Sequence, residues 1–205
     1  MKNRVILGTI FLGMLIGASG CGGNKGSKFV VDPYPVEKLS QATYERYLQK
    51  INQVRQQQRT CDSGVVLGPV GDLNWSDKLH AAAAEHNADM MSITEGNITE
   101  RGTGGPSDHT ARVNHLGHPS SVGERLLTND YLYSVARQNV LAGGDYDTLD
   151  DVVDAWLAEP VTCKRLMDAN VTEMGLAHDH NDSSTYVHYW TIELAKPARE
   201  PKGYI

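Results

Sequence analysis

Apolar side chains recur at helical spacing in two stretches of the N-terminal half. Within residues 41–58 they lie three or four positions apart, at Tyr44, Tyr47, Leu48, Ile51 and Val54. This spacing predicts an amphipathic helix with Ser40 as its N-cap. Residues 73–91 predict a second helix, capped by Ser76, whose run of alanines forms a small-residue face suited to close packing. The intervening residues 60–72 are rich in Gly and Asp and are predicted to form a loop.

The spacing of apolar side chains changes in the C-terminal half. Residues 137–143 predict a short strand, and residues 148–160 predict a helix with a Thr148–Asp151 capping box that ends at Pro160. A shorter helix is predicted at 164–169. Residues 172–179 and 185–195 are rich in β-branched and aromatic side chains and flank a turn-forming segment, which predicts a hairpin. Helices followed by a hairpin predict a layered α/β fold.

Residues 92–130 follow no period and are rich in Gly, Ser, Asn and Pro. Loops of this length are uncommon in compact domains and are often functional.

The first residues read as an export signal rather than as part of the fold. A short basic region precedes the apolar residues 5–18, which are too few for a comfortable membrane span, and small residues lead into Cys21. This end resembles the bacterial lipobox, which implies a signal peptide at 1–20, a lipid on Cys21 and, with Gly22 next, an outer membrane location where one exists. The alternative is cleavage near Ala18. Residues 21–40 are expected to be a flexible tether.

Composition narrows the classes of function. The chain has 205 residues with 40% hydrophobic content, which suits one globular domain and an appendage. Its net charge is −6 and it contains no Lys/Arg run, so a nucleic-acid partner is not expected. Export leads to an oxidising compartment, where the two cysteines other than Cys21 most simply pair, although Cys163 as a nucleophile or metal ligand is the alternative.

Four stretches resemble the CAP superfamily of cysteine-rich secretory, antigen 5 and pathogenesis-related proteins. They are "INQVRQQQ", "LNWSDKLHAAAAEHNADM", "ERLLTNDYLYSVARQNVLAGG", and "VVDAWLAEPVTCKRLMDANVTEMGLA" followed by "YWTIELA". The resemblance implies a three-layer α-β-α sandwich with a central antiparallel sheet over residues 41–197, leaving 198–205 as a tail. It also implies a disulfide between Cys61 and Cys163.

Members of this family often place two histidines and two acids around a cleft, a set that can bind Zn²⁺. Most of that set is changed here. The Glu of the usual Gly-Glu-Asn falls on Gln138, one acid is kept as Glu159, and one His falls on Thr162 or Asn170.

The first histidine of the family set has two alignments in this chain. One alignment places Glu100 there and is favoured, because related bacterial chains carry an insertion after it. The other places His115 there. No cofactor is therefore predicted, although Glu100 and Glu159 could bind a hard divalent cation.

These features favour a membrane-anchored envelope lipoprotein whose domain binds a lipid, a glycan or a protein without catalysis. One alternative is a hydrolase of envelope substrates that uses Glu100 or Glu159 as general base, with or without a metal-bound water. The other is a purely structural envelope protein. Fold alone does not decide among them, because function depends on the site.

Overall fold

The computed structural model describes residues 32–91, 112–113 and 119–198. The described helices are α1 (Gln41–Arg55), α2 (Asp77–Met91), α4 (Val122–Thr128), α5 (Leu149–Ala158) and α6 (Pro160–Leu166). The described strands are β1 (Arg59–Asp62), β2 (Val65–Leu67), β3 (Asn74–Trp75), β4 (Arg112–Val113), β5 (Pro119–Ser120), β6 (Tyr133–Ala142), β7 (Glu173–His180) and β8 (His188–Pro197). None of the helices in this part of the chain has the length and apolar character needed to cross a bilayer.

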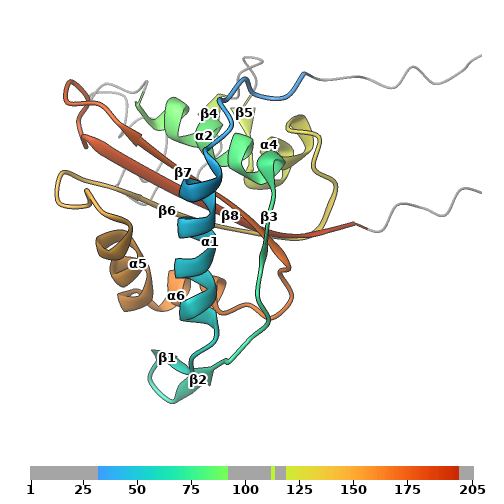
Figure 1. Cartoon of the computed structure of the whole chain (residues 1–205), viewed down its shortest axis with the longest axis vertical. Coiled ribbons are helices and arrows are strands. Elements are labelled where there is room, and N and C mark those ends of the chain that lie inside the picture. The colour runs from blue at the N-terminus through green and yellow to red at the C-terminus, as the bar shows by residue number, and fades with distance from the viewer. Residues whose placement is uncertain (1–31, 92–111, 114–118, 199–205) are drawn as a thin grey trace, which may run out of the picture. The chain divides into compact units, whose positions relative to one another are not determined.

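A four-stranded sheet in the order β3-β7-β8-β6 forms the centre of the domain (Figure 1). The strands β6, β7 and β8 pair antiparallel, and the short β3 adds to β7 in parallel. The β7–β8 hairpin is the one predicted from sequence. Strand β6 is longer than the predicted 137–143, because its first residues pair with the end of β8 beyond residue 194.

Helices cover both faces of this sheet. Trp190, Ile192 and Leu194 of β8 pack into one core with side chains of α1, α5 and α6. The alternate β8 residue Ala195 packs on the opposite face against Leu79 of α2, in a cluster that includes α4. Alternation along a strand sends neighbouring side chains to opposite faces, so the arrangement has three layers. The predicted α-β-α sandwich is confirmed.

The packing of α2 on the sheet depends on small residues. A Cβ atom on Gly175 of β7 would overlap the backbone of Leu79 and His80 in α2. Ala81, Ala82 and nearby alanines of α2 are buried at this contact. The small-residue face predicted for this helix therefore allows the helix backbone to lie directly on the strand.

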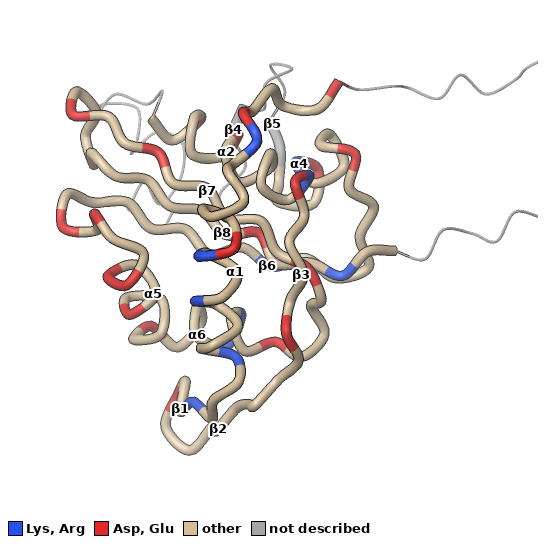
Figure 2. The backbone as a smooth tube through the Cα atoms, in the orientation of Figure 1, with Lys and Arg blue, Asp and Glu red and all other residues tan. Residues whose placement is uncertain are grey.

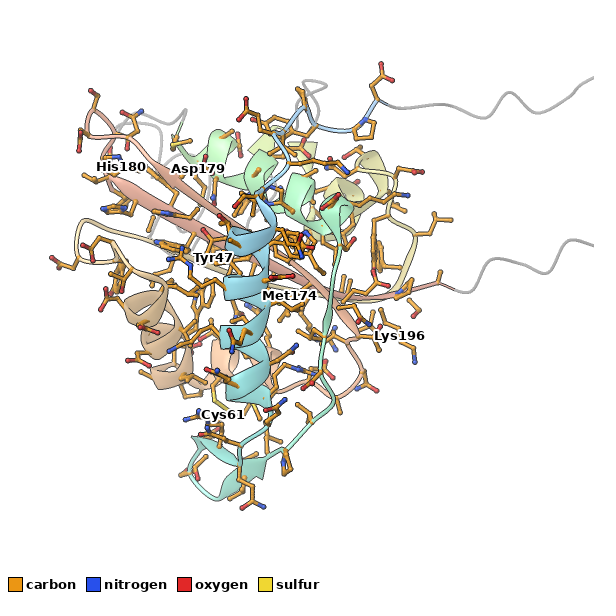
Figure 3. The ribbon with its side chains drawn as sticks, viewed as in Figure 1. Tyr47, Cys61, Met174, Asp179, His180 and Lys196 are labelled. Atoms are coloured by element: carbon orange, nitrogen blue, oxygen red, sulfur yellow. A yellow bond between two sulfur atoms is a disulfide. The ribbon has the colours of Figure 1, made fainter. Side chains whose placement is uncertain are left out.

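The disulfide between Cys61 and Cys163 is confirmed. It joins β1 to α6, and Figure 3 shows Cys61 at the end of the molecule that carries the β1–β2 hairpin. Residues 60–72, predicted as a loop, contain most of this hairpin. The prediction was incomplete because β1 and β2 are short and their outer side chains are exposed, which gives a weak periodic signal.

Ser40 and Thr148 are N-caps, as predicted, although Asp151 bonds to the Thr148 hydroxyl and does not complete a capping box. Ser40 Oγ accepts a hydrogen bond from the Thr43 backbone amide, and Thr148 Oγ1 accepts one from Asp151. Helix α5 does end before Pro160, but Pro160 also begins α6, where proline is favoured because the first helical N–H groups have no intrahelical acceptor.

The last part of the expected tether packs on the domain. Tyr34 and Val36 contact a cluster of alanines that includes Ala83 and Ala177, and the Tyr34 amide donates to Asn129 Oδ1 at 2.9 Å. The domain therefore begins before the predicted residue 41. The predicted signal peptide, Cys21 and most of the tail lie outside the described residues.

Candidate functional site

A cleft of about 550 Å³ runs along β6, which is an edge strand of the central sheet in the described part of the chain. Helix α4 forms one wall and Arg165 of α6 forms the other. The described lining residues are Val122, Gly123, Tyr133, Ser134, Val135, Ala136, Arg137, Gln138 and Arg165. The hydroxyl end of Tyr133 lies against Gly123, at the position that a Cβ atom would occupy.

Gln138 is held on both sides. Its side chain is buried and donates from Nε2 to Glu193 Oε1 at 2.6 Å, across the β6–β8 pairing. Its backbone carbonyl accepts from Arg165 Nη1 at 2.9 Å. Gln138 is among the residues that line the cleft, and its amide group is fixed by β8.

Glu193 is a carboxyl group that the sequence analysis missed. It is fully buried, and burial raises its pKa to about 8, although Arg125 and the Gln138 hydrogen bond act in the opposite direction. The group is therefore mainly protonated at neutral pH. Nothing in the sequence marks it, because a glutamate in an alternating strand is normally read as solvent-facing. Both faces of β8 are covered by helices, which buries it.

The titration of Glu193 gives a testable pH dependence of stability. Its pKa in the folded state lies above the ordinary 4.5, so its stabilising contribution is complete below about pH 4.5 and is lost as the pH rises through about 8. Between pH 5 and pH 9 the free energy of unfolding should fall by at least about 1 kcal/mol more in the wild-type chain than in Glu193→Gln. Urea unfolding across this range measures the difference. The exposed Glu37→Gln is the control, and equal pH profiles for Glu193→Gln and wild type would contradict the assignment.

Glu159 has a structural use in this fold. It is the N-cap of α6, and its Oε2 accepts from the Thr162 amide at 2.7 Å. Partial burial raises its pKa, but the backbone N–H groups of Thr162 and Val161 outweigh this and hold the pKa below its ordinary value. The carboxylate is therefore ionised and hydrogen-bonded to the helix, which makes it a poor general base.

The other residues predicted for the cavity lie at different places relative to the cleft. Thr162 lies beside β6, since its carbonyl accepts from Asn139 Nδ2, but its hydroxyl donates to the Trp156 carbonyl at 2.6 Å. Asn170 is exposed and bonds to Asp168 Oδ1, and it is not among the described lining residues. Glu100 and His115 lie outside the described residues. Among the residues that are described, no group of three or more potential ligands could hold a metal ion.

Arg165 brings the surviving candidates together. It donates to the Gln138 carbonyl, and the Glu159 carboxylate acts on its charge. Arg165 therefore links Gln138, which lines the cleft, to Glu159, which is not among the described lining residues. The sequence analysis did not identify Arg165 as a site residue. Arg137 was likewise missed as a lining residue, because residue type alone does not show which arginines of a surface converge.

A family model identifies the fold. The model of the Cysteine-rich secretory protein family, CAP, matches residues 48–194. The chain belongs to the CAP family. The resemblance found in its sequence is thereby confirmed, and the cleft beside β6 contains the Gln138 position that the family motif assigned to the cavity.

Several solved structures are similar to this chain at low identity. An outer surface protein from Borrelia burgdorferi is 16% identical with a TM-score of 0.52, over 79% of this chain and 98% of that one. An extracellular protein containing a SCP domain from Bacillus anthracis is 16% identical with a TM-score of 0.48, over 78% of this chain and 45% of that one. Venom allergen-like protein 4 from Schistosoma mansoni is 12% identical with a TM-score of 0.41, over 82% and 96%. Among curated proteins, none matches this sequence significantly.

Proposed function

We propose that this CAP protein is an envelope lipoprotein that binds a ligand in the β6 cleft without catalysing a reaction. The observation that carries the proposal is that the described acidic and hydroxyl groups at the predicted cavity positions are already engaged in structural hydrogen bonds. Gln138 replaces the family carboxylate, Glu159 caps α6, and the Thr162 hydroxyl is bonded to Trp156. The nearby buried acid, Glu193, is mainly protonated and is not among the lining residues.

The groups that do line the cleft suit recognition. The described lining combines arginine side chains, hydroxyl groups of Tyr133 and Ser134, and small apolar residues. Clefts of several hundred Å³ with a few fixed polar groups are typical of small-molecule sites. A hydrolase acting through Glu159 has less support, because a base must reach the substrate proton and this carboxylate is bonded to backbone amides.

The location rests on the N-terminal sequence and on the relatives. The lipobox-like end before Cys21 supports a lipid anchor, and several acyl chains together hold a protein stably at a membrane. The Borrelia relative is named as an outer surface protein. An anchored domain would present the cleft to ligands of the envelope, and the ligand classes we consider are lipids, glycans and proteins.

Native mass spectrometry of the full chain, released from its own membranes in a non-ionic detergent, tests the binding function. We expect a non-covalent small molecule on the wild-type chain. We expect none on Ser134→Trp, whose indole would fill the cleft from an exposed strand position. Thr60→Trp, an exposed residue of β1, adds the same side chain elsewhere and should retain the molecule. Absence of any bound molecule on wild type, or equal retention by both variants, would contradict the proposal.

A further inference from the structure

The cleft is cationic on an acidic protein. The whole chain has 25 Asp and Glu against 19 Lys and Arg, yet the described residues lining the cleft include two arginines and no carboxylate. Figure 2 colours Lys and Arg positions blue and Asp and Glu positions red along the described backbone, and red segments recur on several elements, α5 among them. A local reversal of charge in a concave site favours a ligand of the opposite sign.

Arg137 extends from the edge strand with donors to spare. Its Nε bonds to Asp168 Oδ2 at 3.0 Å, its Nη1 bonds to the Ala136 carbonyl at 2.8 Å, and its side chain is 42% exposed. A guanidinium group has five N–H donors, so these contacts use a minority of them.

Arg165 of α6 also lines the cleft and is bonded to β6. Its bond to the Gln138 carbonyl ties it to β6, and the pKa of its guanidinium is lowered by burial and, further, by the positive charge of Arg137. Two guanidinium groups close enough to influence each other repel, and an anion between them would relieve that repulsion. This arrangement matches bidentate recognition of a phosphate or carboxylate group.

Among the described residues, two carboxylates act on this pair, and each has other hydrogen-bond partners. Glu159, which favours the charged form of Arg165, is occupied by the Thr162 amide. Asp168, which bonds to Arg137, also accepts from the backbone and side-chain amides of Asn170. Both carboxylates lie outside the described lining, so a ligand entering the cleft meets the guanidinium groups first.

The size of the cleft indicates more than an inorganic ion. A water molecule occupies about 30 Å³, so a cleft of about 550 Å³ has room for a small organic molecule. Tyr133 and Ser134 lie further along β6. The Ser134 hydroxyl donates to the Lys196 carbonyl at 3.3 Å, and its oxygen can still accept a hydrogen bond from the neutral part of such a molecule.

We propose that the cleft binds a small organic anion, whose phosphate or carboxylate group lies between Arg137 and Arg165. This inference rests on the proposed binding function and narrows its ligand class. The shared chemistry is one anionic group on a polar body, as in a phosphorylated lipid headgroup or an acidic sugar.

Calorimetric titration of the full chain in a non-ionic detergent at low salt tests the inference. Glycerol 3-phosphate and glucuronate are the two anionic probes, and glycerol and glucose are their neutral counterparts. We expect saturable binding of at least one anion and none of its neutral counterpart. The anion that binds more tightly distinguishes a phosphorylated headgroup from an acidic sugar.

Variants locate the binding. Arg137→Gln should lower the affinity for the anion about tenfold or more, because it removes one of the two positive charges. Lys164→Gln is the matched control: it removes the same charge from the adjacent residue of α6, whose Nζ bonds to Asp62 at 2.7 Å outside the cleft, and should leave affinity unchanged. Anions that bind no better than their neutral counterparts, or equal affinity in both variants, would overturn the inference.

The two proposals fail in different ways. A neutral molecule that is retained by wild type and lost from Ser134→Trp, with no anion binding, would leave the binding function standing and remove the anionic ligand. If the wild-type chain retained no molecule in native mass spectrometry and bound no anion in calorimetry, both proposals would be wrong.

Discussion

Gly175→Ala should destabilise the domain by at least about 3 kcal/mol or prevent folding. The added methyl group would overlap backbone atoms of Leu79 and His80, and a helix backbone cannot move aside as a flexible side chain can. Helix α2 would have to move off β7, opening the contact made by its buried alanines. Overpacking usually costs about 1–3 kcal/mol, and overlap with the backbone belongs at the upper end or beyond.

The matched control for this change is Gly144→Ala. Gly144 is exposed, and a Cβ atom there would meet no other atom within 4 Å. Urea unfolding followed by circular dichroism should show Gly144→Ala within about 0.5 kcal/mol of wild type. If the two alanine variants unfolded at the same urea concentration, the close packing of α2 on β7 would be wrong.

Removal of the disulfide should have an effect of similar size. Cys61 and Cys163 are 102 residues apart. In the chain-entropy model, a crosslink that closes a loop of this length lowers the entropy of the unfolded chain and stabilises the folded state by about 4–5 kcal/mol. The Cys61→Ala/Cys163→Ala double variant should therefore unfold at much lower urea, as should wild type under reducing conditions. The bond also holds the β1–β2 hairpin to α6, the helix that supplies Arg165.

Cys21→Ser is the control for cysteine chemistry. It should abolish membrane association if Cys21 carries lipid, and it should leave the urea midpoint of the domain unchanged. If the free energy of unfolding fell by less than about 1 kcal/mol in the double cysteine variant, the disulfide would add little to the stability that the hydrophobic core provides. Membrane association of Cys21→Ser equal to wild type would remove the lipid anchor.

Much of the fold could be predicted because its signals are local. Ser40 and Thr148 cap helices in the way their spacing indicates, and the β7–β8 hairpin follows its run of β-branched and aromatic residues. The short hairpin of β1 and β2 and the full length of β6 could not be predicted. Strands β1 and β2 are short and largely exposed, which leaves a weak periodic pattern. The first residues of β6 are fixed by pairing with distant residues of β8, which a periodic pattern does not record.

The candidate site was predictable only where a motif carried it. Gln138 and Glu159 were found through the family resemblance, and the structure places both near Arg165. Glu193 and Arg137 were missed as site residues, because the first is buried only by helices on both faces of β8 and the second acquires its role from the position of α6. The Glu159 carboxylate looked available in the sequence, but it is the cap of the next helix.

Hydrogen–deuterium exchange of the full chain, with and without a protein-free extract of bacterial envelopes, tests the binding account most directly. The account predicts slower exchange in peptides that cover β6 and α6 around Arg137 and Arg165, and no such change in Ser134→Trp. Protection elsewhere, for example along the exposed face of α1, or identical protection in Ser134→Trp, would show that the cleft beside β6 is not the binding site.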